Sequence, residues 1–314
     1  MTDSTAPPAD VRSPRKAWIQ APGLLLAPTV LWMGLFFFLP LLVVFVISFM
    51  MRGTYGGIEW TLTLANYVNL ADPLYLMVYL RSFLLALATT ALCLLFGFPL
   101  AYWIARAPAR WQPVWLVLVM IPFWTNFLVR TYAWIFILRT EGLMNTVLLH
   151  LGLVAEPIEI LYTNTAVLIG LVYGYLPFMV LPLYAAMERL DRSLVEAAAD
   201  LYAPGWSRFR RVILPLTKPG VIAGCLLVFV PAVGAFITPD LLGGARTMMV
   251  GTLIQHEYLV VRDWPFGSAV SFVLMAVVLL GVMAYFKVDR VRVKGQGTGG
   301  GTLFVGEGFG ESRP

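Results

Sequence analysis

Long apolar runs alternate with shorter polar stretches along most of the chain. A helix of about 20 apolar residues crosses a bilayer core of about 30 Å, and six runs reach that length. They predict an all-α, polytopic membrane protein with six transmembrane helices, at residues 23–50, 78–105, 113–138, 164–187, 219–241 and 264–286. Prolines inside these runs predict kinks, since neighbouring helices can satisfy the carbonyl groups that a proline leaves free.

The polar segments complete the domain organisation. Residues 1–20 and the Gly-rich residues 291–314 are predicted to be disordered tails on either side of one transmembrane domain, residues 21–290. The densely charged segment 188–218 is predicted to be a loop held at the membrane surface. Three further segments are predicted to form short interfacial helices: 51–77, 139–163 and 242–263.

The composition agrees with a membrane protein. The 314 residues are 60% hydrophobic and 12% charged, whereas a soluble domain is about a quarter charged. No nucleic-acid partner is predicted, because no soluble domain is large enough to carry a basic face. Cys93 and Cys225 lie in apolar runs without CxxC or Cys/His spacing, so we interpret both as core residues and predict no metal site.

The distribution of Lys and Arg predicts which side of the membrane each segment faces, because cytoplasmic segments carry an excess of both. With the N-terminus inside, 16 of the 22 basic residues are cytoplasmic, and both termini are predicted to be cytoplasmic. The cytoplasmic set is Arg12, Arg15, Lys16, Arg106, Arg110, Arg189, Arg192, Arg208, Arg210, Arg211, Lys218, Lys287, Arg290, Arg292, Lys294 and Arg313.

The charged loop 188–218 is predicted to begin with a helix. Ser193 and Glu196 have the Ser-x-x-Glu spacing of a capping box, in which each side chain accepts a hydrogen bond from the backbone amide of the other residue. The same helix is predicted to carry an apolar face formed by Leu194, Ala198 and Leu201.

A turn at Pro204–Gly205 is predicted to lead into a second short helix, which Pro215 and Pro219 end before the next span. The second helix places Trp206, Phe209 and Ile213 on one side and Arg208, Arg210 and Arg211 on the other. Periodicity alone leaves two interpretations open, an amphipathic element facing anionic lipid and a docking element for a protein partner.

A sequence motif in this loop favours the docking element. Glu196-Ala197-Ala198, followed by Val212-Ile213-Leu214-Pro215, resembles the EAA signature of bacterial binding-protein-dependent ABC importer permeases. In that family the pattern is Glu-Ala-Ala, three residues, Gly, nine residues, then Ile-x-Leu-Pro, and the Glu-to-Pro spacing matches here. Tyr202 stands at the position of the family glycine, and because Tyr does not readily adopt positive φ, we expect Pro204–Gly205 to take over the turn.

The resemblance extends over most of residues 80–280 and is strongest with the polyamine (spermidine/putrescine) permease branch. Four further segments are similar to that branch: Pro122 to Trp134, Leu216 to Gly224, Pro231 to Gly244 and Arg262 to Gly267.

The resemblance implies a type I ABC importer permease fold in a bacterial inner membrane. It implies a non-catalytic subunit without a cofactor, since ATP is bound and hydrolysed by a separate ATPase subunit dimer. It also implies membrane lipid, an extracytoplasmic substrate-binding protein and a second permease subunit as partners, and polyamine systems lead us to expect a paralogue in the last role. The residues expected to dock the ATPase are Glu196, Ala197, Ala198, Asp200 and Gly205.

Polar and aromatic side chains inside the spans are candidates for lining the substrate path, because such groups are costly in a membrane unless they face a cavity or a partner helix. Aromatic faces hold ammonium groups by cation–π contact, and a carboxylate such as Asp240 pairs with one end of a polyamine. Arg130 argues against a simple cation tunnel, so we expect it to be neutralised, to lie at the outer interface or to bind the docking protein. The alternative is that the aromatic residues serve packing and the interfacial belt. The candidates are Trp124, Asn126, Tyr132, Tyr173, Tyr175, Phe236 and Asp240.

Three other functions compete with a polyamine permease. The first is a permease for another small organic solute on the same scaffold. The second is an ion-coupled secondary transporter, but the inverted repeats and intramembrane carboxylates of that class are not evident. The third is a membrane enzyme, which ranks last because there is no His-Glu-x-x-His motif, no carboxylate pair in a span and no nucleophile–base set.

Overall fold

The computed structural model describes residues 21–297. The two predicted tails therefore lie largely outside the described residues, at 1–20 and 298–314. Residues 291–297, which the sequence assigned to the C-terminal tail, continue the last helix, α13 (Trp264–Gly297).

Helices make up most of the described chain, which confirms the predicted all-α membrane class. Five helical segments are long and apolar enough to cross a membrane, and a bent helix pair supplies the sixth. The α-helices are α1 (Ala21–Met33), α2 (Leu39–Ile47), α3 (Ala65–Leu70), α4 (Pro73–Arg106), α5 (Gln112–Trp124), α6 (Phe127–Leu138), α7 (Leu143–His150), α8 (Asn164–Glu188), α9 (Arg192–Asp200), α10 (Gly205–Arg208), α11 (Leu214–Val233), α12 (Val250–His256) and α13. Short π and 3-10 turns join them: η2 (Gly34–Phe38), η3 (Phe209–Ile213), η4 (Pro239–Gly243), η5 (Gly244–Thr247) and η6 (Glu257–Val261).

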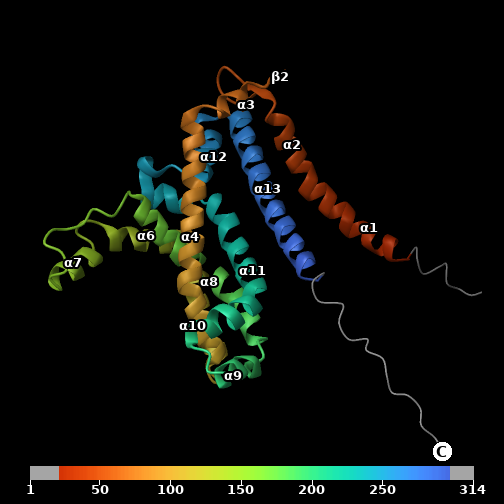
Figure 1. Ribbon diagram of the computed structural model, residues 1–314. Helices are drawn as coiled ribbons and strands as arrows, with labels where there is room; N and C mark the ends of the chain where they lie inside the picture. The colour runs from red at the N-terminus through yellow and green to blue at the C-terminus, as the bar shows by residue number, and fades with distance from the viewer. Residues whose placement is uncertain (1–20, 298–314) are drawn as a thin grey trace, which may run out of the picture.

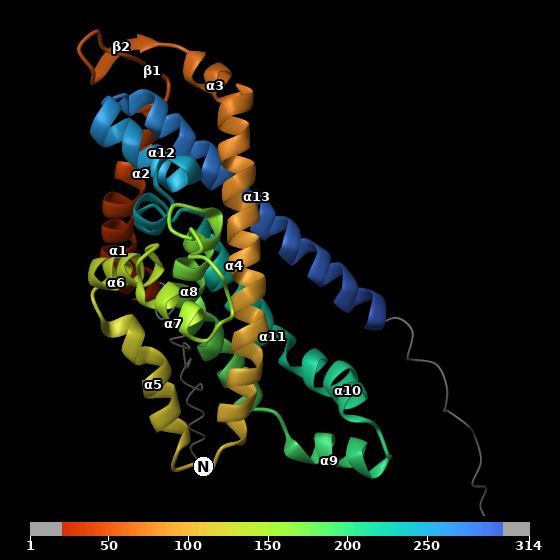
Figure 2. The same cartoon turned by 90° about the vertical axis from the view of Figure 1, so that its left-hand side faces the viewer.

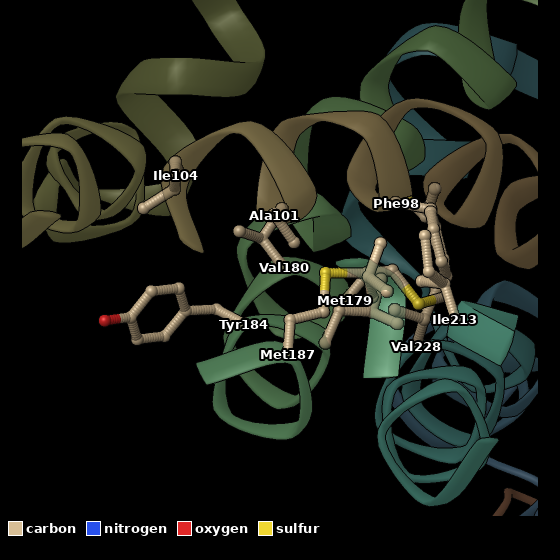
Figure 3. Packing of buried hydrophobic residues seen from close by; sticks show 12 residues of the cluster. Phe98, Ala101, Ile104, Met179, Val180, Tyr184, Met187, Ile213 and Val228 are labelled. Atoms are coloured by element: carbon tan, nitrogen blue, oxygen red, sulfur yellow. The ribbon is translucent and has the colours of Figure 1, made fainter. Parts of the chain in front are cut away.

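The centre of the molecule is a bundle of α4, α8 and α11 (Figure 1). Glycines allow the closest approach in this bundle, since a Cβ built on Gly220 of α11 would lie 2.6 Å from the carbonyl oxygen of Pro182 on α8. Gly224, one turn on, approaches Met179 in the same way, so the pair forms a Gly-xxx-Gly contact. Figure 3 shows the core beside it, where side chains of α4, α8, η3 and α11 meet: Phe98, Ala101, Ile104, Met179, Val180, Tyr184, Met187, Ile213 and Val228.

The first span forms an arm, α1–η2–α2, that stands away from this bundle (Figure 1). None of the residues in its apolar window is buried. Its main neighbour is α13, where the ring of Phe45 lies 5.1 Å from that of Phe272. Figure 2 shows that α13 itself diverges from α11 toward the end of the molecule that carries α9 and α10.

The opposite, outer end carries a small β-hairpin, and within residues 51–77 the predicted short helices are confirmed only by α3 (Ala65–Leu70). Strand β1 (Met50–Arg52) pairs antiparallel with β2 (Ile58–Leu62). Gly56 and Gly57 form the turn with positive φ, the conformation in which glycine replaces other residues without steric cost. Short helices also occur in the other two outer segments, as α7 in 139–163 and α12 in 242–263.

Two of the predicted spans are wrong in shape. The third is not one helix, because α5 and the α6–α7 segment meet at an angle of 86°. The fifth begins earlier and ends earlier than 219–241, since one continuous helical segment runs from Gly205 to Val233. The predicted stop at Pro215 fails because η3 provides a π turn, in which the Leu214 amide donates to the Phe209 carbonyl and the helix widens ahead of the proline ring.

Candidate functional site

The N-terminus of α9 in the charged loop is capped by Asp191, so the predicted capping box at Ser193 is wrong. The Asp191 carboxylate accepts the Ser193 amide at 2.9 Å. That hydrogen bond favours the ionised carboxylate and lowers the pKa of Asp191. The helix starts two residues earlier than the Ser-x-x-Glu spacing suggested, because an aspartate is at least as good an N-cap as a serine.

α9 ends at Asp200, and Tyr202, two residues further on, adopts the left-handed conformation with φ of 56°. The Tyr202 amide donates to the Ala199 carbonyl at 2.9 Å, and the Ala203 amide donates to the Ala198 carbonyl at 3.1 Å. These two bonds are the pair that defines a Schellman motif, in which glycine is the usual residue at the left-handed position. The expectation that the turn moves to Pro204–Gly205 is therefore wrong, because Tyr202 takes the glycine conformation and Gly205 lies in the first turn of α10.

The buried face of α9 is formed by Val195, with 9% of its surface exposed, which packs into the core beside α4 and α8. The predicted apolar face is wrong, since Leu194 and Leu201 are 48% and 82% exposed. Glu196, Ala197 and Asp200 are all exposed, and Ala198 is half-buried. These are the residues for which the family resemblance implied docking of the ATPase.

Large apolar side chains are exposed at the tip of the loop, around the α9–α10 turn. Leu201, Tyr202 and Trp206 are 82%, 96% and 71% exposed, and the ring of Trp206 stacks on Phe209 at 5.3 Å. The helical periodicity places Leu201 on an apolar face of α9 and does not predict this tip, although three large apolar residues beside a turn in a charged loop are a usable signal.

A cavity of about 370 Å³ lies behind α9 and is lined by residues of α4, α8, α9 and α10. Polar groups from three of these elements face it, namely Arg106, Glu196 and Arg208. Nearby, the Tyr184 hydroxyl lies 3.1 Å from both Gln112 Oε1 and Glu188 Oε1. Gln112 in turn donates to the carbonyl of Ala107 at 3.0 Å, so α8 is hydrogen-bonded to the α4–α5 turn at the base of the loop.

Inside the membrane, the break between α5 and α6 brings several of the predicted path residues together. Trp124 is the last residue of α5 and is 69% exposed. Asn126 caps α6, since its side-chain oxygen accepts the amides of Leu128 and Val129 at 2.9 and 3.4 Å. Asn126 thus holds the start of the second half-helix in place.

Arg130, on the first turn of α6, folds back onto the end of α5. Its Nη1 donates to the Pro122 carbonyl at 2.9 Å. Its guanidinium lies 5.0 Å from the centre of the Phe127 ring and 5.8 Å from that of Tyr173 on α8. Its partners are a helix-end carbonyl and two ring faces, none of which carries an opposing charge, so the three expected placements of Arg130 stay predictions.

The other predicted path residues lie around this break without forming one cluster. Tyr173 packs edge-on against Trp134 of α6 at 5.4 Å, whereas the Tyr175 hydroxyl donates to the Pro231 carbonyl of α11 at 3.3 Å. Tyr132 of α6 is 50% exposed. Phe236 and Asp240 lie between α11 and α12, with Asp240 on η4, which packs against both α6 and α8.

Comparison with known proteins agrees with this architecture. Residues 94–292 match the family described as binding-protein-dependent transport system inner membrane component. The chain is 46% identical to the spermidine/putrescine transport system permease protein PotB of Escherichia coli (strain K12), over 84% of this chain and 96% of that protein. It is 32% identical to the inner membrane ABC transporter permease protein YdcU of the same organism, over 84% and 87% of the two chains.

A solved structure shares the fold. It is a bacterial ABC transporter involved in the import of the acidic polysaccharide alginate, which aligns with a TM-score of 0.64 and 19% identity over 88% of this chain and 96% of that chain. The predicted permease fold and the resemblance to the polyamine branch are therefore confirmed. The chain belongs to the family of multi-pass inner-membrane permease components of binding-protein-dependent ABC importers.

Proposed function

We propose that this permease passes spermidine- or putrescine-like polyamines across the inner membrane. The observation that carries the proposal is the 46% identity to spermidine/putrescine permeases over 84% of the chain, against 30% identity to the molybdenum transport system permease protein ModB of Azotobacter vinelandii over 65% of the chain. The geometry supports it, because the intramembrane break presents a helix-end carbonyl and aromatic faces, which are groups that bind cations.

The test is reconstitution of the complete transporter in proteoliposomes with its cognate binding protein. We expect ATP-dependent uptake of radiolabelled spermidine or putrescine, unaffected when the proton gradient is dissipated. A binding protein that takes up sugars or anions and ignores polyamines would identify a permease for another solute. Uptake that persists without any ATPase subunit and collapses with the proton gradient would identify a secondary transporter.

We infer that the subunit itself is non-catalytic and that α9 and the start of α10 dock a separate ATPase subunit dimer. The docking residues are Glu196, Ala197, Ala198 and Asp200 on α9 and Gly205 on α10. The exposed residues of α9 and the apolar tip beside them support this inference, because exposed apolar patches mark protein interaction sites. A second permease subunit, expected to be a paralogue, and an extracytoplasmic binding protein complete the proposed assembly.

Substitution at Ala197 tests the docking surface. Ala197 is exposed on α9, so Ala197→Arg adds a bulky charge without filling the core. We expect the ATPase to be lost on co-purification while the permease stays folded. Ala71→Arg is the matched control, since Ala71 is also an exposed alanine but lies at the outer end of the molecule, after α3. Equal loss of the ATPase in both variants would refute the docking surface.

A further inference from the structure

The C-terminal end of α5 lies inside the membrane-spanning region, at the break before α6. The last carbonyl groups of a helix lack intrahelical partners and carry a partial negative charge. In other transporters with broken helices, such half-helix ends coordinate cations. Here the Pro122 carbonyl accepts two hydrogen bonds, one from the Thr125 hydroxyl at 2.7 Å and one from Arg130 at 2.9 Å.

The groups around the Arg130 guanidinium form a cation site. Beside the Pro122 carbonyl, the faces of Phe127 and Tyr173 lie at 5.0 and 5.8 Å from the guanidinium carbon. Gly174 presents bare backbone there, since a Cβ at that position would lie 3.7 Å from Nη2. Within residues 21–297, the partners found for this guanidinium are a carbonyl and ring faces, and no carboxylate pairs with it.

A primary ammonium group is bound by the same chemistry. It donates to carbonyl oxygens and is attracted by aromatic faces. A polyamine carries such a group at each end. The side chain of Arg130 therefore occupies a site whose ligands suit one end of the proposed substrate.

We propose that Arg130 is a resident cation, which fills the site at the end of α5 between transport events and is displaced by an ammonium group of the polyamine. This inference rests on the proposed polyamine function. Exchange of one cation for another leaves little net binding energy, so the substrate is held weakly and leaves quickly. Arg130 thereby sets the affinity of the path while remaining outside the chemistry of ATP hydrolysis.

Equilibrium binding tests the exchange directly. Radiolabelled spermidine is titrated into the complete transporter in lipid nanodiscs, without ATP or binding protein. In Arg130→Gln the resident charge is absent, and we expect spermidine to bind about tenfold more tightly than to the wild type. Arg130→Lys keeps a cation in the site and is expected to bind spermidine as weakly as the wild type does.

The maximal rate of transport should fall as the affinity for spermidine rises. In proteoliposomes, Arg130→Gln is expected to lower both the KM and the kcat of spermidine uptake, because a tighter site releases its substrate more slowly. Arg81→Gln is the matched control, since Arg81 is also half-buried and donates to a backbone carbonyl, that of Arg246, at 2.8 Å, away from the break. It should leave spermidine affinity unchanged.

Several results would overturn the proposal. Unchanged or weaker binding in a folded Arg130→Gln complex means that Arg130 only braces the break. If that variant is not monodisperse, Arg130→Met is titrated instead, and failure of both neutral variants to fold assigns Arg130 a structural role. Absence of spermidine uptake by the wild type refutes the polyamine function alone, because tighter spermidine binding by Arg130→Gln still shows a vacated cation site.

Discussion

At the scale of single residues, Tyr202 shows how backbone hydrogen bonds can hold a residue in a conformation that its side chain disfavours. The left-handed region costs a non-glycine residue about 1–2 kcal/mol, and the two amide bonds of the Schellman motif retain Tyr202 there. Because its ring is 96% exposed, the cost is not recovered by packing within this chain.

We predict that Tyr202→Gly stabilises the loop by up to about 1 kcal/mol, since glycine adopts positive φ without strain but loses more entropy on folding. Tyr202→Val should destabilise it by a similar amount or more, because β-branched residues are the least compatible with this region. Hydrogen exchange of the Ala199 to Ala203 amides measures both changes. Gly205→Ala is the control and should have little effect, since Gly205 has ordinary φ and open space around its Cα.

Glu257 is a buried carboxylate at the outer end, only 8% exposed. Burial raises the pKa of Glu257, and the negative charge of Asp263 raises it further, while His256 and Arg52 oppose the shift. The folded state therefore holds this proton more tightly than the unfolded state does. The stabilising contribution is complete below the ordinary glutamate pKa of about 4.3 and is lost as the pH rises through the raised value.

We predict that Glu257→Gln raises the apparent Tm at pH 8, where the wild-type carboxylate is ionised, and that the difference shrinks as the pH falls toward 4. Tryptophan fluorescence during heating at a series of pH values measures this. Glu59→Gln, at an exposed position on β2, is the control and should follow the wild-type profile. A Tm difference independent of pH would contradict the assignment to Glu257 ionisation.

At the scale of elements, hydropathy found an apolar helix or a bent helix pair for each predicted run, with the fifth displaced, because the thickness of the bilayer imposes a length on each apolar run. It missed the break in the third span because hydropathy averages over the window, whereas the break depends on two side chains. Asn126 caps α6 and Arg130 satisfies the end of α5, and both bonds become visible only in three dimensions. Similarly, proline spacing predicted that the helix stops at Pro215, but the π turn η3 makes room for the proline ring and the helix continues.

The close contact between α8 and α11 depends on glycines of α11, which have no side chain at the contact. We predict that Gly220→Val lowers the apparent Tm by several degrees, because its side chain would meet the Pro182 carbonyl and the Ala186 Cβ, each within 2.6 Å of the first added carbon. Overpacking of this kind costs about 1–3 kcal/mol. Gly281→Val on α13 is the control and should be tolerated, since nothing lies within 4 Å of that position.

At the scale of the whole molecule, the first span is the least buried of the five unbroken candidate spans within residues 21–297. A site of about 730 Å³ between the arm α1–η2–α2 and α13 is lined almost entirely by apolar side chains, including Leu35, Phe38 and Phe272. The sequence predicted this span by length but carried no sign of its position, since a lipid-facing helix and one that packs on a partner are equally apolar.

We predict that the second permease subunit covers this arm in the assembled transporter. A fluorophore on Leu35→Cys, in a chain with Cys93 and Cys225 replaced by alanine, should be quenched by brominated lipid when the chain is alone. Quenching should fall by half or more after assembly with the second permease. The ATPase alone should not protect the fluorophore, and unchanged quenching in the full complex would leave the arm in lipid.

The hairpin at the outer end has a consequence for biogenesis. The Gly57 amide donates to the Arg262 carbonyl, and Arg52 donates to that of Val261, 209 residues further along the chain. The first span is thus fastened by partners that leave the ribosome almost last. Until residues 261 and 262 have been synthesised, the arm lies in the bilayer without these hydrogen bonds. The fold is completed only when the last span has been inserted.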